Sequence, residues 1–304
     1  MKFGTHHLLE GPFTKTEAQA YEEHLEQMVL GDQLGFDRVW LTEHHFSSVP
    51  HVEGVPGEYG LCASPFAMAC AIATMTNNVR IGTAVKVLPL EHPLRTAEDA
   101  AMADIVSDGC IDFGVGLGYR KYEFDGFCVA PDDKLERFIE ALDIILGVWT
   151  TDEYEYKGKF WDIPRLTLVP KPLQKPHPPV WVATRLGTKE AIDFIAANNY
   201  RMLSAWTPRA ELRATYELLK QSRESSGMTG AFNFTCLRHV FVADSDADAK
   251  RLGGDYIEYC MNSTPLFRPI GDHERDEMVF GGVDTYIEKI RGLSADTGVN
   301  NLIC

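Results

Sequence analysis

The chain carries a dense group of ionisable and aromatic side chains at the end of one apolar run. Glu43, His44, His45 and Phe46 follow residues 36–41 after one threonine, and that run reads as a buried strand. An imidazole titrates near neutral pH and can act as a base or as a hydrogen-bond partner. Solvent-facing surface does not need this density of chemistry, so we interpret the cluster as part of a functional site.

A metal site is the first alternative for these histidines. The possible ligands are His6, His7, His44, His45 and His51. Neighbouring residues of a strand point to opposite faces, so an adjacent pair does not chelate one ion easily. The His-x-His pattern expected after the first strand of a barrel metallohydrolase does not occur. We therefore expect no metal, and metal analysis of the purified protein would test the metallohydrolase alternative.

A second polar group could bind a phosphate. Thr184, Arg185 and Thr188 lie where a strand-like run meets a helix-like run. Exposed backbone N–H groups and the helix dipole favour an anion there, and Arg185 adds a bidentate donor. The alternative is an ordinary helix N-cap with a solvent-facing Arg185, and the spacing leaves both interpretations open. The run Gly114-x-Gly116-x-Gly118 would let the backbone approach a flat ligand, although it lacks the spacing of a dinucleotide fingerprint.

Eight strand-like runs must position these residues, and helix-like runs separate them. The strand-like runs are 2–7, 36–41, 79–85, 110–116, 179–184, 201–206, 234–243 and 299–304. We expect helices at 64–75, 187–198, 246–260 and 283–296, after Pro93, Pro131 and Pro208, and from a capping box at Thr14-x-x-Glu17 to near Gly35. The proline-rich segment 150–178 reads as a connecting excursion.

This alternation implies parallel strands and favours one closed (β/α)8 barrel of TIM type spanning residues 1–304. The polar, irregular segment 261–281 predicts an insertion between the seventh and eighth strands. The chain stops inside the eighth strand-like run, so the final helix is expected to be absent.

Composition limits the possible partners and the compartment. The 304 residues carry 29 basic and 44 acidic side chains, a net charge of −15, which argues against nucleic acid and acidic membrane surfaces. Seven scattered cysteines form no CxxC pair and read as reduced thiols. Since the chain shows neither a signal-like start nor an apolar run of ~20 residues, we expect a cytoplasmic protein.

Three segments resemble the bacterial luciferase-like flavin monooxygenases. Residues 40–46 resemble that family's Glu-His-His-Phe segment, and residues 88–99 and 112–124 resemble its motifs after the third and fourth strands. The resemblance runs in order along the whole chain. It implies a (β/α)8 fold and reduced FMN as a loosely bound co-substrate that a separate NAD(P)H:flavin reductase supplies. It also implies O2 activation as a flavin hydroperoxide, oxygenation of a small organic substrate, and a homodimer.

The resemblance also assigns roles to residues of this chain. It implies that His44 is the catalytic histidine with Glu43 beside it, that Ala84–Val85 is a non-prolyl cis peptide under the flavin, and that 261–281 is a mobile lid. The expected cofactor-binding residues are Ala84, Val85, Gly116, Leu117, Thr184, Arg185, Thr188 and Trp206. The expected pocket residues are Phe3, His45, Phe46 and Glu123, with Trp206 a further candidate for its apolar wall.

Two positions depart from the family pattern. Leu117 stands where many relatives carry an arginine that meets the FMN phosphate, which removes a charge-assisted contact worth ~1.5–3 kcal/mol. Arg185 can compensate, and without it FMN binds weakly. Gly116 stands where luciferase has a reactive cysteine, so light emission is not implied.

Two further alternatives remain open. One is a deazaflavin-dependent oxidoreductase on the same barrel, which titration with both cofactors would distinguish. The other is a non-catalytic flavin-binding or partner subunit, which would add nothing over free flavin in a turnover assay. The fold does not fix the substrate, and aldehydes, ketones, terpenes and polyketides are all possible.

Overall fold

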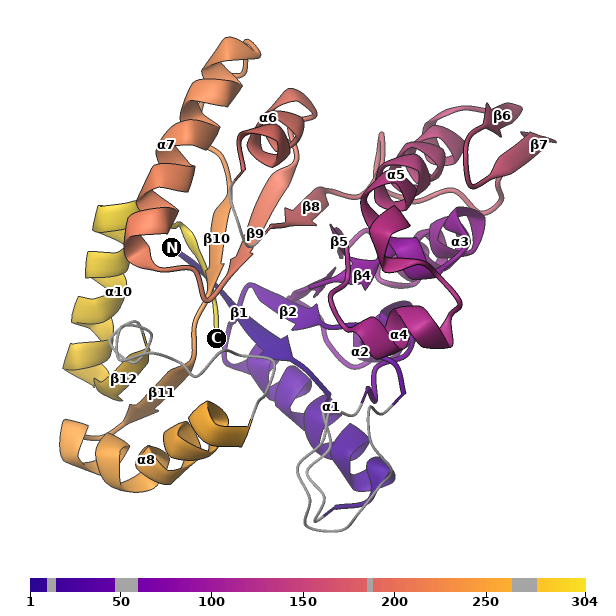
Figure 1. The fold of residues 1–304 in the computed structure, drawn as a ribbon. Coiled ribbons are helices and arrows are strands. Elements are labelled where there is room, and N and C mark those ends of the chain that lie inside the picture. The colour runs from indigo at the N-terminus through magenta and orange to yellow at the C-terminus, as the bar shows by residue number, and fades with distance from the viewer. Residues whose placement is uncertain (10–14, 47–59, 185–187, 264–277) are drawn as a thin grey trace. The chain divides into compact units, whose positions relative to one another are not determined.

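The computed structural model describes residues 1–9, 15–46, 60–184, 188–263 and 278–304, without the side chains of 255–263. The chain divides into two compact units (Figure 1). One unit is Thr5–Ala183, and the other joins Met1–Gly4 to Thr184–Cys304. Each unit is described by itself, and the single domain expected from the sequence stays a prediction.

The Thr5–Ala183 unit is built on parallel strands. β2 (Arg38–Leu41) pairs with β3 (Arg80–Thr83), β3 with β5 (Ile111–Gly116), and β5 with β8 (Val180–Ala183) and the short β4 (Lys86–Val87). β2 and β5 are buried along their whole length, as expected for parallel strands covered on both faces. Trp40 packs edge-on against Trp181, and Phe113 against Trp149, inside this core.

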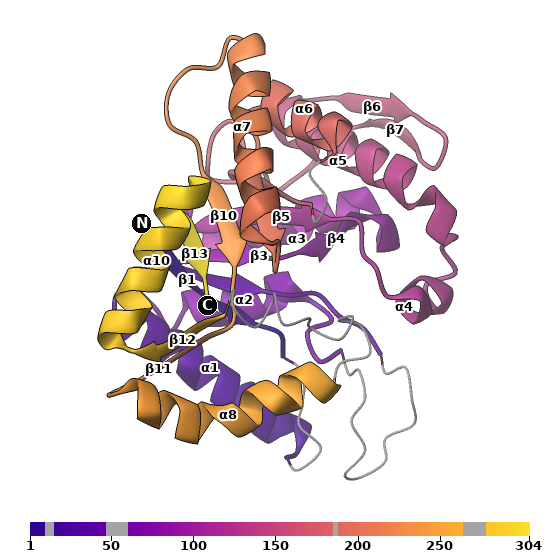
Figure 2. The same cartoon turned by 60° about the vertical axis from the view of Figure 1, so that its left-hand side comes forward.

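Helices connect these strands (Figure 2). They are α1 (Glu17–Gln33), α2 (Pro65–Ala73), α3 (Pro93–Val106), α4 (Lys121–Gly126) and α5 (Lys134–Thr150), with the 3-10 turns η1 (Leu88–Leu90) and η2 (Pro131–Asp133). Thr16 and Gln19 form the capping box of α1, so the predicted box at Thr14 and Glu17 was wrong. The true box starts two residues later, and Thr14 lies outside the described residues.

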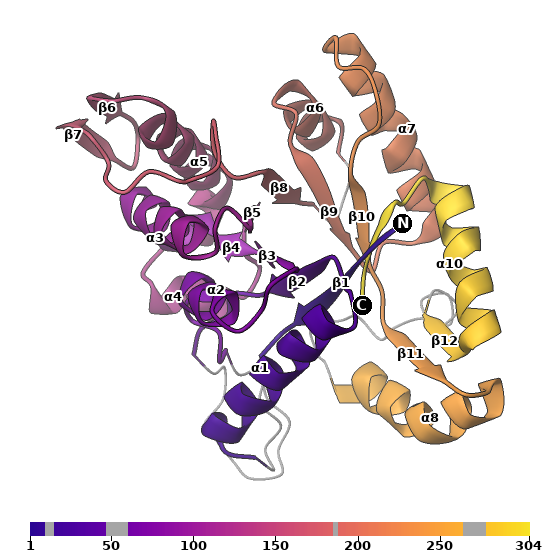
Figure 3. The same cartoon turned by 180° about the vertical axis from the view of Figure 1, so that it is seen from behind.

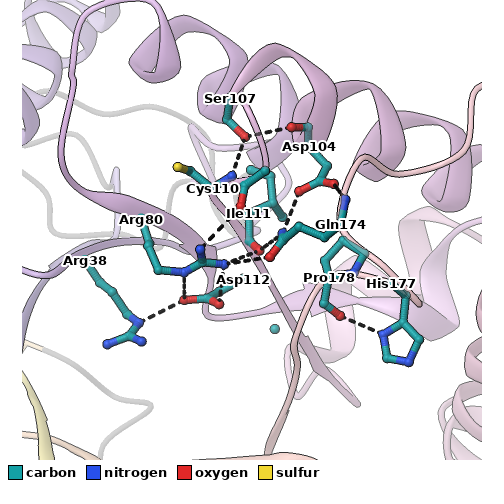
Figure 4. Close-up of polar contacts among 12 residues, drawn as sticks. Arg38, Arg80, Asp104, Ser107, Cys110, Ile111, Asp112, Gln174, His177 and Pro178 are labelled. Atoms are coloured by element: carbon teal, nitrogen blue, oxygen red, sulfur yellow. Dashed lines mark hydrogen bonds and ion pairs between the residues drawn. The ribbon is translucent and has the colours of Figure 1, made fainter.

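A buried charge network ties the amino-terminal ends of three strands together (Figure 4). The Asp112 carboxylate, fully buried in β5, accepts hydrogen bonds from Arg38 Nε at 2.8 Å and from Arg80 Nη2 at 3.0 Å. Arg80 also donates to the carbonyl of Ile111 at 2.9 Å and to Gln174 at 3.2 Å. The amino-terminal ends of the strands in such α/β folds usually serve stability and not catalysis. We therefore interpret the network as structural.

The second unit also alternates parallel strands and helices (Figure 3). The start of β1 (Lys2–His7) pairs with β13 (Asn301–Ile303), β13 with β10 (Phe234–Leu237), and β10 with β9 (Arg201–Ala205). The helices are α6 (Lys189–Ala197), α7 (Arg209–Ser225), α8 (Asp246–Ser263) and α10 (Val283–Thr297), and α10 packs against α7. β11 (Val240–Ala243) and β12 (Val279–Gly282) form a separate parallel pair.

Several expectations need correction. The single strand predicted at 234–243 is two strands, because the chain changes partner at Arg238 and His239. Arg238 N donates to Ile303 O at 3.0 Å on the β13 side, whereas His239 O accepts from Val279 N at 3.0 Å on the β12 side. The sequence also missed α4 and the antiparallel hairpin β6 (Tyr154–Lys157) and β7 (Asp162–Leu166) within the excursion 150–178. Of the predicted lid 261–281, residues 264–277 lie outside the described residues.

Among the described residues, no helix combines the length and the apolar character needed to cross a bilayer. The same residues contain no group of three His, Cys, Asp or Glu side chains arranged as metal ligands.

Candidate functional site

The polar cluster follows the carboxyl end of β2, where backbone hydrogen bonds fix its course. His44 N donates to Cys62 O at 3.1 Å, and Gly60 N donates to Phe46 O at 2.7 Å. The two segments lie so close that a Cβ on Gly60 would be 2.3 Å from the carbonyl carbon of His44. Gly60 is therefore required for this close approach, which holds residues 44–46 in place.

The helix α4 brings a carboxylate to the two histidines. Glu123 Oε1 lies 3.2 Å from Nδ1 of His44 and accepts the backbone N–H of His45 at 2.9 Å. Glu123 is 1% exposed and His44 is 5% exposed, so the pair is shielded from water. The ring of Tyr119 packs edge-on against His44 with centroids 5.8 Å apart. The sequence placed Glu123 in a substrate pocket, and the structure directs its carboxylate at His44.

A second buried carboxylate holds His45. Glu43 Oε1 lies 3.0 Å from Nε2 of His45 and 2.6 Å from Nζ of Lys86, and its Oε2 accepts the N–H of Val87 at 2.5 Å. Burial alone would raise the pKa of Glu43, but the Lys86 ammonium and the hydrogen bonds from His45 and Val87 outweigh it, and the pKa is lowered. Glu43 is therefore a charged, buried anchor between β2 and β4.

The expected cofactor-binding residues of this unit lie together after β3 and β5. The Ala84–Val85 peptide bond is cis, as the resemblance implied. Val87 pairs with Gly116, and a Cβ on Gly116 would lie 2.5 Å from Cγ2 of Val85. The backbone of Gly116 thus approaches the Val85 side chain closely. Ala84, Val85 and Leu117 are each half-buried, so these strand ends present a partly accessible apolar strip.

Phe46 stands at the edge of the cluster. It is 50% exposed and lies 5.1 Å from the ring of Phe127, with His45 4.7 Å from the same ring. This places an apolar, partly exposed aromatic pair beside the two buried histidines, and the role of Phe46 in a pocket wall stays a prediction.

The remaining predicted residues belong to the other unit. Thr188 is the N-cap of α6 and accepts the N–H of Ala191 at 3.4 Å, which agrees with the capping alternative for this residue. Thr184 N donates to Leu203 O at 3.1 Å, and Arg185 lies outside the described residues. Trp206 stacks on His239 with centroids 5.6 Å apart. Phe3 is half-buried in β1 and pairs in register with Leu302.

Sequence reasoning missed Lys86, whose ammonium joins Glu43 to Glu91. The signal was present, because Lys86 is the one cation in the apolar run 84–90, and a buried lysine requires a counter-ion. Lys86 follows β3, and the parallel neighbour of β3 is β2, which is followed by Glu43, so Glu43 is a nearby candidate for that counter-ion.

Comparisons with known proteins agree with the geometry. The family model for luciferase-like monooxygenases matches residues 1–292. The chain is 31% identical over 251 residues to the oxygenase component of the flavin-dependent trigonelline monooxygenase of Acinetobacter baylyi. That alignment covers 78% of this chain and 63% of the relative, so the chain spans less than two thirds of that protein.

Solved structures agree as well. Monooxygenase RslO1 from Streptomyces bottropensis matches with a TM-score of 0.89 and 26% identity, covering 100% of this chain and 91% of that one. The oxygenating constituent of 3,6-diketocamphane monooxygenase from Pseudomonas putida, in complex with FMN, matches with a TM-score of 0.85, 20% identity and the same coverage. An F420-dependent secondary alcohol dehydrogenase shares the fold at a TM-score of 0.74 and 16% identity, covering 99% and 92%. These matches confirm the predicted (β/α)8-barrel fold class.

Proposed function

The chain belongs to the luciferase-like monooxygenase family, and from this membership we propose that it is the oxygenase of a two-component system. It would take reduced FMN from a separate NAD(P)H:flavin reductase and use O2 to oxygenate a small organic substrate. The observation that carries the proposal is the buried His44–Glu123 pair, 3.2 Å apart, in the same unit as the apolar strip at Ala84, Val85 and Leu117.

The residues present fit a flavin ring. An isoalloxazine needs a flat, largely apolar surface with a few polar groups beside it. The half-buried side chains of Ala84, Val85 and Leu117 supply such a surface, and Gly116 adds no side chain to it. Among the described residues, no hydrogen bond is seen at Nε2 of His44, whose Nδ1 faces Glu123. We propose that Nε2 is the atom of His44 that meets the bound ligand.

The remaining predicted residues lie in the other unit. From the resemblance we propose that Thr184, Arg185 and Thr188 form a phosphate site, since Thr188 caps α6 and a helix N-terminus favours an anion. Trp206 and Phe3 stay candidates for an apolar wall. Leu117 carries no charge at a position where many members of the family carry an arginine, which suits a cofactor that arrives reduced and leaves after one turnover.

When bound and reduced, FMN supplies the activation of O2. The chain itself contributes a group that can accept or donate a proton at one defined atom, Nε2 of His44. Because Glu123 accepts from Nδ1–H of His44, the neutral ring carries its lone pair on Nε2, and Nε2 can take up or return a proton. Burial of the pair keeps bulk water from competing for that position.

The decisive experiment supplies the full chain with FMN, a flavin reductase, NAD(P)H and isotopically labelled O2. Candidate substrates are an aldehyde series, cyclic ketones and N-methylpyridinium carboxylates, the last chosen from the name of the trigonelline relative. We expect one labelled oxygen atom in a product, and slower re-oxidation of reduced FMN than in free solution. Re-oxidation at the rate of free flavin would contradict the proposal and favour the non-catalytic subunit.

The fold similarity to an F420-dependent dehydrogenase keeps a deazaflavin oxidoreductase as the second candidate. Parallel binding titrations with FMN and F420 separate the two. Tighter binding of F420, with substrate oxidation in the absence of O2, would favour this second candidate.

A further inference from the structure

Lys86 is a buried cation that no part of the proposed oxygenation uses. Its side chain is 5% exposed, and its ammonium lies 2.6 Å from Glu43 Oε1 and 2.8 Å from Glu91 Oε2. An isolated ammonium at this depth would lose its proton. Burial alone would lower the pKa of Lys86, but the two carboxylates outweigh it and the pKa is raised. The ammonium is therefore charged.

The two carboxylates differ in their surroundings. Glu43 is 1% exposed in its side chain, and besides Lys86 it contacts His45 Nε2 and the N–H of Val87. Glu91 is 36% exposed in its side chain and also accepts a hydrogen bond from Thr96 Oγ1 at 3.1 Å. Glu91 can be solvated without Lys86, whereas Glu43 cannot. The balance of charge around Glu43 thus depends on Lys86.

His45 is the group nearest to that balance of charge. If Lys86 is removed, the buried Glu43 carboxylate loses its cation, and the nearest imidazole that can take up a compensating proton is His45, 3.0 Å away. With Lys86 in place, the charge of Glu43 is compensated, and His45 contributes a hydrogen bond. The other groups that face this chain of contacts are Cys62 near Glu43, whose thiol has a pKa raised to about 12 first by burial and then by Glu43, Asp99, which interacts with Lys86, and Glu123, whose Oε1 accepts the backbone N–H of His45 at 2.9 Å. None of the three carries a positive charge, so none replaces the ammonium.

We propose that Lys86 is a positioning residue of this site, which keeps His45 neutral by compensating the buried charge of Glu43. The surface carboxylate Glu91 opposes it, because it shares the same ammonium. Through the Glu43–His45 contact, Lys86 sets the charge of the residue next to His44 in the chain. The proposal deepens the proposed function and rests on it only for its consequence in catalysis.

The test reads the ring of His45 directly, in the full chain without flavin. Nitrogen NMR of histidine-labelled protein distinguishes a neutral ring that carries its proton on Nε2 from a doubly protonated ring. In the wild type we expect the neutral form at neutral pH. In Lys86→Met the doubly protonated form should persist to a proton concentration at least about tenfold lower. In Glu91→Gln, which frees the ammonium for Glu43 alone, the change should have the opposite sign.

Two further variants serve as controls. Glu43→Gln/Lys86→Met removes both charges, so His45 should return to the neutral form even if Lys86→Met alone folds poorly. Lys121→Met removes an exposed lysine that pairs with Asp125 at 2.6 Å, and it should leave His45 unchanged. An unchanged His45 ring in Lys86→Met, or changes of equal sign in Lys86→Met and Glu91→Gln, would overturn the proposal. Since the measurement uses no flavin and no turnover, its failure is distinct from failure of the proposed function.

Discussion

Glu123 places one carboxylate oxygen 3.2 Å from Nδ1 of His44 and thereby ties α4 to the end of β2. We expect Glu123→Gln to lower the rate of labelled-oxygen incorporation at least about tenfold, because a neutral amide holds the His44 tautomer less firmly. The FMN dissociation constant should change little, since Glu123 is buried and its carboxylate contacts His44. Asp125→Asn, an exposed change on the same helix, is the control. Equal turnover in both variants would exclude this role for Glu123.

His44→Ala should remove the proton-accepting Nε2 altogether, with a loss of about 100-fold or more in turnover. If Glu123 acts through His44, the double variant His44→Ala/Glu123→Gln should be no slower than His44→Ala alone. Multiplicative losses in the double variant would show that the two side chains act independently.

Gly116 and Val85 compete for the same space. Gly116→Ala would bring a methyl group to 2.5 Å from Val85 Cγ2, so we expect a loss of about 1–3 kcal/mol in the free energy of unfolding. Adding Val85→Ala makes room, and the double variant should be more stable than the two single losses together predict. Urea denaturation measures all four proteins. Simple additivity would mean that the contact is not tight in solution.

Much of the fold could be predicted because short strand-like runs alternate with helix-like runs along the chain. The run 2–7 coincides with β1. Pro93 and Pro208 predict where two helices begin, and the helices start at Pro93 and Arg209. α4 was missed because six residues show too little periodicity, although it carries Glu123. The hairpin β6–β7 was missed because Pro164 lies within β7 and further prolines follow it.

The candidate site also contains residues that the sequence predicts and contacts that it does not. Glu43, His44 and His45 could be found from their density after a strand, and the cis Ala84–Val85 bond only from the family resemblance. The pairing of Glu123 with His44 joins residues 79 positions apart, and no local pattern reports such a contact. Lys86 could have been found, because a lysine inside an apolar run requires a buried carboxylate.

The network around Asp112 should govern stability and not turnover (Figure 4). Asp112→Asn leaves Arg38 and Arg80 without their shared buried carboxylate, so we expect a loss of about 3 kcal/mol in the free energy of unfolding. Asp125→Asn breaks only an exposed pair and should cost less than about 0.5 kcal/mol. Turnover per folded molecule should be unchanged, because the network lies at the amino-terminal ends of the strands. A selective loss of turnover would contradict its structural role.

His7 predicts how stability depends on pH. Burial, and then the charges of His24 and His6, lower the pKa of His7 from 6.5 to about 3. The folded state therefore keeps this ring neutral, whereas the unfolded chain protonates it below about pH 6.5. Its contribution to stability is fully present above pH 6.5 and is lost as the pH falls toward 3. The pKa of His24, whose Nδ1 lies 3.5 Å from that of His7, is lowered as well and acts in the same direction.

In His7→Gln this proton uptake disappears from the unfolded state. The difference between the unfolding free energies at pH 7 and pH 5 should therefore be smaller than in the wild type, by about 2 kcal/mol. Urea denaturation at the two pH values measures it, and the comparison of differences cancels any loss of packing that the substitution causes at both. His24→Gln should also reduce the difference, since it removes the second ring that unfolding protonates. An equal difference in His7→Gln and the wild type would mean that the His7 ring is protonated in the folded protein too.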